Sequence, residues 1–357
     1  MTDAAGAIRA ARLTDRQALA ALSRRVHASA EAHRRSLGVP AADATRPRIS
    51  LGALIPSWLP LRSPSVHLVA EQDGQLVGSA RAISEPHRPD WVIIELDADD
   101  GEMAAEVRWH LLTAMVEEAG REGVARFHVA CADVRENLEL FGQAGFMAYA
   151  QEEICYRPPE ALHGPGSWLR SFVDARRGRG PGNDDGHRPV AASTAVRPAG
   201  SPDAWHLFDL WTHATPPAIA RIEDYHAADW EGAGHDAVVP RSSLNPLLHF
   251  TEASAWMLTG EQRAAAMAQH GVCRDGPHYL RFLIRDGADG AQFLRDVLHG
   301  PAREAAAAGI LAPVRTYESA GLHAATAVGF ESIGRVTLLV REVRAQVRQP
   351  ALVPVVH

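Results

Sequence analysis

Apolar-rich runs separated by turn signals organise the first half of the chain. Residues 65–71 and 75–83 form two such runs, joined by Asp73-Gly74. Asp-Gly between apolar runs is the strongest short signal for a β-hairpin. A third apolar run, 91–96, predicts another strand after the hairpin.

The rest of this half switches between helical and strand-like spacing. Residues 102–121 carry apolar side chains at helical intervals, and 125–130 read as a buried strand. We expect Asp133 to cap the next helix, with Glu136 as its capping-box partner. Gly145 suits the left-handed position that ends a helix. A last strand is expected over about 149–156. This order predicts an α/β fold in which helices flank a mixed sheet.

The second half repeats the end of this pattern. Its predicted elements are a strand at 279–284, a helix from 291, a strand at 312–316, a helix at 319–328 and a strand at 335–341. The segment 231–271 shows no clear periodicity.

Matching segments at both ends of the halves indicate an internal duplication. Val196 follows Ile8 by 188 residues, and each begins a similar run before a predicted helix. Gly329-Phe330 follows Gly145-Phe146 by 184 residues. Two similar offsets in the same order favour two copies of one domain.

A segment without apolar side chains other than proline, Arg176–Pro189, divides the chain near its middle. It is interpreted as a flexible linker, with a nucleic-acid-binding arm as the alternative. The predicted organisation is a first domain at 1–157, a linker at 158–193, a second domain at 194–344 and a tail at 345–357.

Composition narrows the function classes. The chain has 357 residues, 46% hydrophobic and 22% charged, with a formal net charge of −7. This balance argues against sequence-independent nucleic-acid binding, which needs a basic surface. No apolar run approaches a membrane span, so we expect a cytoplasmic protein without a membrane partner. The cysteines Cys131, Cys155 and Cys273 are far apart and the histidines show no metal-ligand spacing, so no metal site is expected.

The segment Glu139–Phe146, reading ELFGQAGF, resembles the Leu-Tyr-Glu-Lys-x-Gly-Phe ending of GNAT (N-acetyltransferase) domains. The resemblance spans about 6–157 and 194–344, and it implies two tandem GNAT-like domains. It further implies acetyl-CoA, or another acyl-CoA, as co-substrate. The acceptor would be an amine on a small molecule, a side chain or a protein N-terminus. The acceptor, the acyl chain and the oligomeric state stay open.

In the family, a glycine-rich loop between a central strand and the next helix holds the CoA pyrophosphate. Arg285-Asp286-Gly287-Ala288-Asp289-Gly290 in the second half is one change from that motif. The resemblance therefore implies cofactor binding by Ile284, Arg285, Gly287, Ala288 and Gly290. A plain turn is the alternative interpretation, because Asp and Gly are common in turns for conformational reasons.

The first half departs from the family pattern. Met103, Glu106 and Arg108 occupy the slots of the pyrophosphate loop, and none is glycine. We therefore expect no CoA binding there. Glu95 lies on the strand where the family often keeps its catalytic base, but a structural ion pair is the preferred interpretation. Phe141 stands where the family commonly has a proton-donating Tyr.

In the second half that Tyr position is Ala325. Tyr317, near the end of a central strand, could replace it, with Glu318 beside it as a second candidate catalytic residue. Adjacent strand residues face opposite ways, so both are not expected to point at one substrate. The alternative is a Tyr at the rim with a solvated hydroxyl.

Two functions remain open. One is an acyl-CoA-dependent N-acyltransferase with one competent half. The other is a catalytically degenerate GNAT-fold protein that binds a ligand or a partner, because fold does not fix function.

Overall fold

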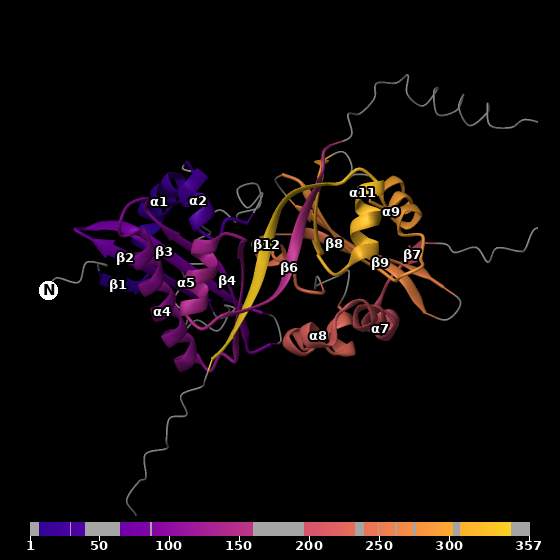
Figure 1. Ribbon diagram of the computed structural model, residues 1–357, viewed down its shortest axis with the longest axis horizontal. Coiled ribbons are helices and arrows are strands. Elements are labelled where there is room, and N and C mark those ends of the chain that lie inside the picture. The colour runs from indigo at the N-terminus through magenta and orange to yellow at the C-terminus, as the bar shows by residue number, and fades with distance from the viewer. Residues whose placement is uncertain are drawn as a thin grey trace, which may run out of the picture. The chain divides into compact units, whose positions relative to one another are not determined.

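The computed structural model divides the chain into two compact units (Figure 1). The first unit comprises Met1–Glu152, Ser242–Leu248 and Gly334–His357, and the second comprises Glu153–Arg241 and His249–Ile333. Within them the structure describes residues 7–28, 30–39, 65–85, 88–159, 196–232, 239–248, 250–260, 263–273, 276–302 and 308–343. The predicted tail and all but two residues of the predicted linker lie outside these ranges.

The sheet of the first unit has the strand order β1-β2-β3-β4-β5-β12. Its strands are β1 (Ala7–Ala10), β2 (Ser65–Gln72), β3 (Gln75–Ser84), β4 (Asp90–Ala98), β5 (Arg126–Ala132) and β12 (Glu331–Glu342). Strands β4 and β5 are parallel and the other neighbours are antiparallel. The predicted hairpin is confirmed: Asp73 and Gly74 have φ values of 50° and 77° and connect the paired residues Gln72 and Gln75.

Helices cover both faces of this sheet. They are α1 (Arg16–Ala28), α2 (Ala30–Arg35), α4 (Ala104–Glu122) and α5 (Arg135–Gln143). A Cβ on Gly78 of β3 would lie 2.5 Å from Val107 and 2.9 Å from Leu111, so this side of β3 touches α4. The opposite side carries Val69 in a cluster with Leu19 of α1. The predicted mixed sheet between helices is confirmed.

The predicted cap of α5 is wrong. The helix begins at Arg135 with Val134 as its N-cap, and no side chain caps it. The carboxylate of Asp133 instead accepts hydrogen bonds from Thr337 (3.3 Å) and Gln151 (3.2 Å). These partners come from strands far away in the sequence, which local spacing does not reveal.

The second unit has the strand order β6-β11-β10-β9-β8-β7. Its strands are β6 (Met147–Arg157), β7 (Val196–Pro198), β8 (Phe250–Thr259), β9 (Ala264–Cys273), β10 (His278–Ile284) and β11 (Ile310–Arg315). Strands β10 and β11 are parallel, whereas β7 to β10 form antiparallel pairs. Strands β8 and β9 fall in the segment without clear periodicity. Strand β9 reads AAAMAQHGVC, and alanine has a low strand propensity.

Helices again cover both faces: α7 (Ala204–Ala214) and α8 (Pro217–Glu223), then α9 (Gly290–His299) and α11 (Ser319–Ala327). Phe282 of β10 packs in one core cluster with Phe293 of α9 and Ala324 of α11. The next residue, Leu283, belongs to a different cluster with Leu210 of α7. Alternation along β10 therefore places α9 and α11 on one face and α7 on the other.

The duplication appears in matching contacts. Arg9 forms an ion pair with Asp15 at 2.7 Å, and Arg197, 188 residues later, forms one with Asp203 at 2.6 Å. Each Asp also accepts a backbone N–H three residues back. The guanidinium, as hydrogen-bond donor, holds the pKa of each carboxyl below its ordinary value.

The helix ends match as well. Gly145 and Gly329 have φ values of 80° and 88°, as predicted for the left-handed position. After each, the Phe N–H donates to a carbonyl five residues back, Phe146 to Phe141 (2.9 Å) and Phe330 to Ala325 (3.0 Å).

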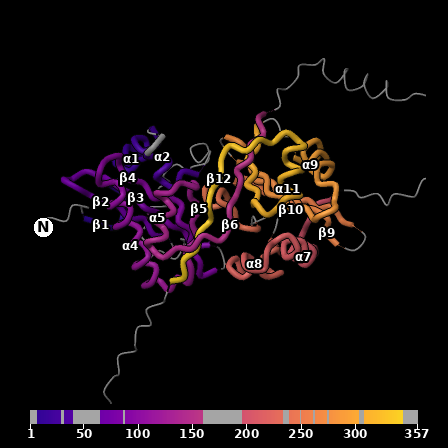
Figure 2. The backbone as a smooth tube through the Cα atoms, viewed as in Figure 1, coloured from indigo at the N-terminus to yellow at the C-terminus, as the bar shows by residue number. Residues whose placement is uncertain are grey.

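The compact units are not contiguous in sequence. Residues of β12 from Gly334 belong to the first unit, where Val336–Glu342 pair with β5 (Figure 2). Residues of β6 from Glu153 belong to the second unit, where β6 neighbours β11. The ranges 1–157 and 194–344 stay a proposal for the extent of the two repeats.

A buried imidazole generates the first prediction. His270 of β9 is 6% exposed, stacks between Trp256 and His278, and lies 2.9 Å (Nε2 to Nδ1) from His278. Burial, with a smaller effect of His278, lowers the pKa of His270 from 6.5 to about 4. The unfolded chain therefore binds a proton that the folded chain does not between these values, so the free energy of unfolding falls as pH drops from 6.5 towards 4.

We expect urea unfolding to show a loss of roughly 3 kcal/mol over this range. His270→Phe should remove most of that loss, whereas the exposed His299→Phe should leave it. An unchanged pH dependence in His270→Phe would contradict the assignment.

Candidate functional site

In the second unit, the parallel strands β10 and β11 separate soon after they pair. His278 pairs with Ile310 and Tyr279 with Leu311, and no further pair follows. Gly309 O accepts from His278 N–H at 2.9 Å, so the odd-numbered residues of β11 direct their backbone groups to β10. Pro313 is the next odd residue after Leu311 and has no N–H to donate. The ladder therefore ends at Pro313.

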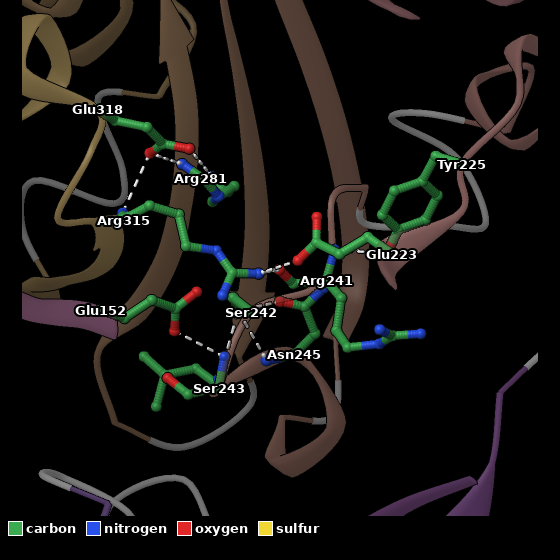
Figure 3. Close-up of polar contacts among 11 residues, drawn as sticks. Glu152, Glu223, Tyr225, Arg241, Ser242, Ser243, Asn245, Arg281, Arg315 and Glu318 are labelled. Carbon is green, nitrogen blue, oxygen red and sulfur yellow. Dashed lines mark hydrogen bonds and ion pairs between the residues drawn. The ribbon is translucent and has the colours of Figure 1, made fainter. Parts of the chain in front are cut away.

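A side-chain ion pair occupies the next position of the ladder. Continued pairing would join Phe282 O to Arg315 N–H. Instead, Arg281 Nη1 donates to Phe282 O (2.7 Å), and Arg315 N–H donates to Glu318 Oε2 (3.1 Å). Arg281 also holds both carboxylate oxygens of Glu318, at 2.8 and 2.5 Å (Figure 3). We call the unmade bond between Phe282 O and Arg315 N–H the ladder gap.

A second buried ion pair lies beside the first. Arg315 Nη2 is 2.5 Å from Glu223 Oε1 of α8 and 2.8 Å from Arg241 O (Figure 3). Arg315 and Glu223 are at most 1% exposed. Sequence analysis missed Arg281, Arg315 and Glu223. The signal was an arginine inside the apolar runs YLRFLI and ILAPVR, because a buried charge needs a partner.

Tyr317 lies between these ion pairs in sequence, and neither Tyr317 nor Glu318 is on a strand. Strand β11 ends at Arg315, and Glu318 is the N-cap of α11. Tyr317 is half-buried, and burial raises the pKa of its phenol above 10. Within the described ranges, its hydroxyl has no hydrogen-bond partner. It is therefore a neutral group that can donate its proton.

Glu318 is differently placed from the expected catalytic carboxylate. It is 7% exposed, and the contacts with Arg281 and with Arg315 N–H engage both of its oxygens. A carboxylate held in this way is poorly placed to accept a proton from a substrate.

The loop before α9 combines features for and against phosphate binding. Gly287 has a φ of 86° and open space where a Cβ would be. Over the described residues, the backbone N–H groups of Gly287, Asp289 and Ala291 have no acceptor, as an anion site at a helix N-terminus requires. However, Asp289 caps α9 by accepting from Gln292 N–H at 2.9 Å.

The predicted side-chain contacts are less favourable. Arg285 forms an ion pair with Asp209 of α7 at 2.7 Å and donates to Ala264 O at 3.2 Å. Gly290 is required by packing, since a Cβ there would lie 2.5 Å from Ile284 and 3.1 Å from Ala324. The backbone of this loop thus fits a phosphate group, while its side chains supply no cation.

In the first unit, the chain itself fills the space beside the parted strands. Strands β4 and β5 pair up to Ile93 and Val129. Beyond that point, Ala132 N–H of β5 donates to Leu37 O at 2.6 Å, and Ser36 Oγ donates to Asp97 of β4.

Arg108 of α4 secures this arrangement. It is 3% exposed and donates to Arg35 O and to Asn137 (3.2 Å). Asn137 in turn donates to Arg34 O at 2.9 Å. The residues of the first unit therefore do not fit CoA: Arg108 takes the place of a loop glycine, and 36–38 take the edge of β5.

Glu95 of β4 is part of a polar row across the first unit. Ser79 Oγ donates to Glu95 Oε1 at 2.5 Å and lies 3.0 Å from His67 Nε2. The His67 and Glu95 side chains are 4.0 Å apart. The expectation of a structural interaction for Glu95 matches this geometry.

Comparisons with known proteins place these features in context. No protein-family model matches the sequence, and a search of curated proteins finds no match. A tandem GNAT protein from the clavulanic acid biosynthesis pathway is 12% identical, with 95% of this chain and 98% of that chain covered and a TM-score of 0.46. A GCN5-related N-acetyltransferase from Sphaerobacter thermophilus is 14% identical over 96% and 98% of the chains, with a TM-score of 0.48.

A GNAT-family acetyltransferase from Colwellia psychrerythraea is 9% identical over 95% and 100% of the chains, with a TM-score of 0.39. The likeness is to the fold, including its tandem form. It agrees with the resemblance that the sequence indicated.

Two further features were searched over the described residues alone. No helix there is long and apolar enough to cross a membrane. No group of three or more His, Cys, Asp or Glu side chains there could hold a metal ion.

The contacts of Arg108 generate the second prediction. Arg108→Met should lower the free energy of unfolding by roughly 1.5–3 kcal/mol, because hydrogen bonds from a buried guanidinium are lost. Arg121→Met removes an exposed ion pair with Glu118 on the same helix and should change it by less than about 1 kcal/mol. Chemical denaturation measures both. Equal effects of the two substitutions would contradict the role of Arg108.

Proposed function

We propose that this chain is an acyl-CoA-dependent N-acyltransferase, with acetyl-CoA as the expected donor and an amine as the acceptor. The second unit is the proposed site. One observation carries the proposal: three backbone N–H groups without acceptors among the described residues lie at and before the N-terminus of α9, directly after the strand that separates from β11.

The backbone around Gly287 and Gly290 would hold the cofactor phosphates, with Ile284, Arg285 and Ala288 completing the loop. Exposed backbone donors and the helix dipole attract an anion without a cationic side chain. Asp286 and Asp289 weaken the site electrostatically, so moderate affinity is expected. When bound, the cofactor supplies an acyl thioester for the amine and a thiolate as leaving group.

Tyr317 is the proposed proton donor. Its raised pKa keeps Oη protonated at neutral pH, so it can give its proton to an anion that develops nearby. Glu318 is proposed to act through Arg281 and the backbone and not as a base. The amine acceptor would then lose its proton to solvent or to a second amine.

A second candidate is a GNAT-fold protein that binds a ligand without catalysis. The ion pair of Arg285 with Asp209 favours it, because this arginine is not free to contact phosphate. Calorimetric titration with acetyl-CoA separates the two candidates, since only the first requires binding at α9.

The third prediction concerns the charge of this loop. Asp286→Arg replaces an exposed acid by a base beside the proposed phosphate site, and should tighten acetyl-CoA binding by about 3–10-fold at low salt. Asp296→Arg makes the same change about 9 Å further along α9 and should alter affinity less than about 2-fold. Isothermal titration measures both. Equal responses would place the phosphates elsewhere.

The fourth prediction concerns Tyr317. Tyr317→Phe should slow thiol release from acetyl-CoA, with a panel of primary amines, by roughly 100-fold, the scale of general acid catalysis. The dissociation constant for acetyl-CoA should stay within about 2-fold, because the hydroxyl acts on the leaving group. A Tyr317→Phe protein with the wild-type rate would show that this phenol is not the acid.

A further inference from the structure

Tyr317 occupies a tight turn that the Glu318 side chain helps to close. Glu318 N–H donates to Arg315 O at 2.9 Å, and Arg315 N–H donates back to Glu318 Oε2 at 3.1 Å. Two hydrogen bonds in opposite directions thus close the four residues 315–318. The conformation around Tyr317 therefore depends on the position of one carboxylate.

Arg281 fixes that carboxylate to the neighbouring strand. Its guanidinium binds both oxygens of Glu318 and also Phe282 O of β10. The ladder gap, which Pro313 leaves open, is thereby bridged by side chains. The turn that carries Tyr317 is held at a defined distance from β10 although the two strands are not paired there.

Arg315 gives the turn a second attachment. Its guanidinium pairs with Glu223 of α8 and donates to Arg241 O. One end of the turn is thus tied to α8 and the other to β10 (Figure 3).

Stability alone is a poor explanation for two buried ion pairs. Desolvating such a pair often offsets its attraction, and well-packed apolar residues of similar volume can be as stable. Both pairs converge on the four residues around Tyr317.

We infer that Arg281 and Glu318, supported by Arg315 and Glu223, are positioning residues that hold Tyr317 in its half-buried place. The catalytic meaning of this arrangement rests on the proposed function. The arrangement itself does not, because it can be measured on the phenol directly.

The charges that face Tyr317 explain why its titration reports position. Arg315 and Arg281 lower its pKa, Glu318 and Glu223 raise it, and burial is the largest cause of the rise. Removing a matched pair of opposite charges therefore leaves the local charge balance nearly unchanged. A fall in the pKa after such a change reports that the phenol has become more exposed.

The test compares wild type with Arg281→Met/Glu318→Leu, which replaces the pair by apolar side chains so that no single charge is left buried. Tyrosinate absorbance is recorded immediately after a jump to alkaline pH, before unfolding. Subtracting the same titration of a matched Tyr317→Phe protein isolates one phenol among the five tyrosines. The control is Arg197→Met/Asp203→Leu, which removes an ion pair in the same unit.

We expect the pKa of Tyr317 to fall by at least about one unit in Arg281→Met/Glu318→Leu and to stay unchanged in the control. Nitration by tetranitromethane, mapped by mass spectrometry, should become faster at Tyr317 in the same variant only. If that variant melts near the wild-type temperature and Tyr317 titrates and reacts as before, the inference is overturned.

If the double variant does not fold, Glu318→Gln serves instead. Its amide oxygen can still accept from Arg281 or Arg315 N–H, but one negative charge near the phenol is lost. The pKa of Tyr317 should then fall, and an unchanged value would overturn the inference. Failure of wild type to bind acetyl-CoA would remove the proposed function and leave the titration result standing.

Discussion

Parallel strands that separate leave backbone donors and acceptors without ladder partners, and a buried backbone group without a hydrogen bond is costly. This constraint shapes both units. In the first, the main chain answers it, with Leu37 O accepting from Ala132 N–H. In the second, Arg281 and Glu318 satisfy Phe282 O and Arg315 N–H. One topological feature has thus received two chemical solutions within a single duplicated chain.

The difference between these solutions bears on function. Main-chain filling fixes a segment between two strands and leaves no edge group for a ligand. Side-chain filling leaves the loop before α9 independent, with its N–H groups still exposed. The second unit is therefore where ligand chemistry has room, and the first unit is best understood as the structural partner of the pair.

Local signals predicted much of the fold. Asp73-Gly74 specifies its turn through two left-handed residues, and the Gly-Phe endings of α5 and α11 place the same backbone bond in both halves. The alanine-rich strand β9 was missed because its stability comes from its neighbours and not from its propensity.

The candidate site was less predictable. The loop at 285–290 lies where the motif indicated, but the pairing of Arg285 with Asp209 depends on a helix 76 residues earlier. The position of Tyr317 depends in the same way on Glu223, 92 residues before Arg315. Residue spacing gives no access to such contacts. Charged residues inside apolar runs were the available clue, and they indicate that a partner exists without identifying it.

The order of synthesis acquires a meaning from one pairing in the sheet. Strand β5 is made in the first half of translation, yet its antiparallel neighbour, Val336–Glu342, is among the last segments to leave the ribosome. Until then, one edge of β5 is open to any other strand, including that of another nascent chain. The cell must therefore protect an incomplete sheet for nearly the whole time needed to make this protein.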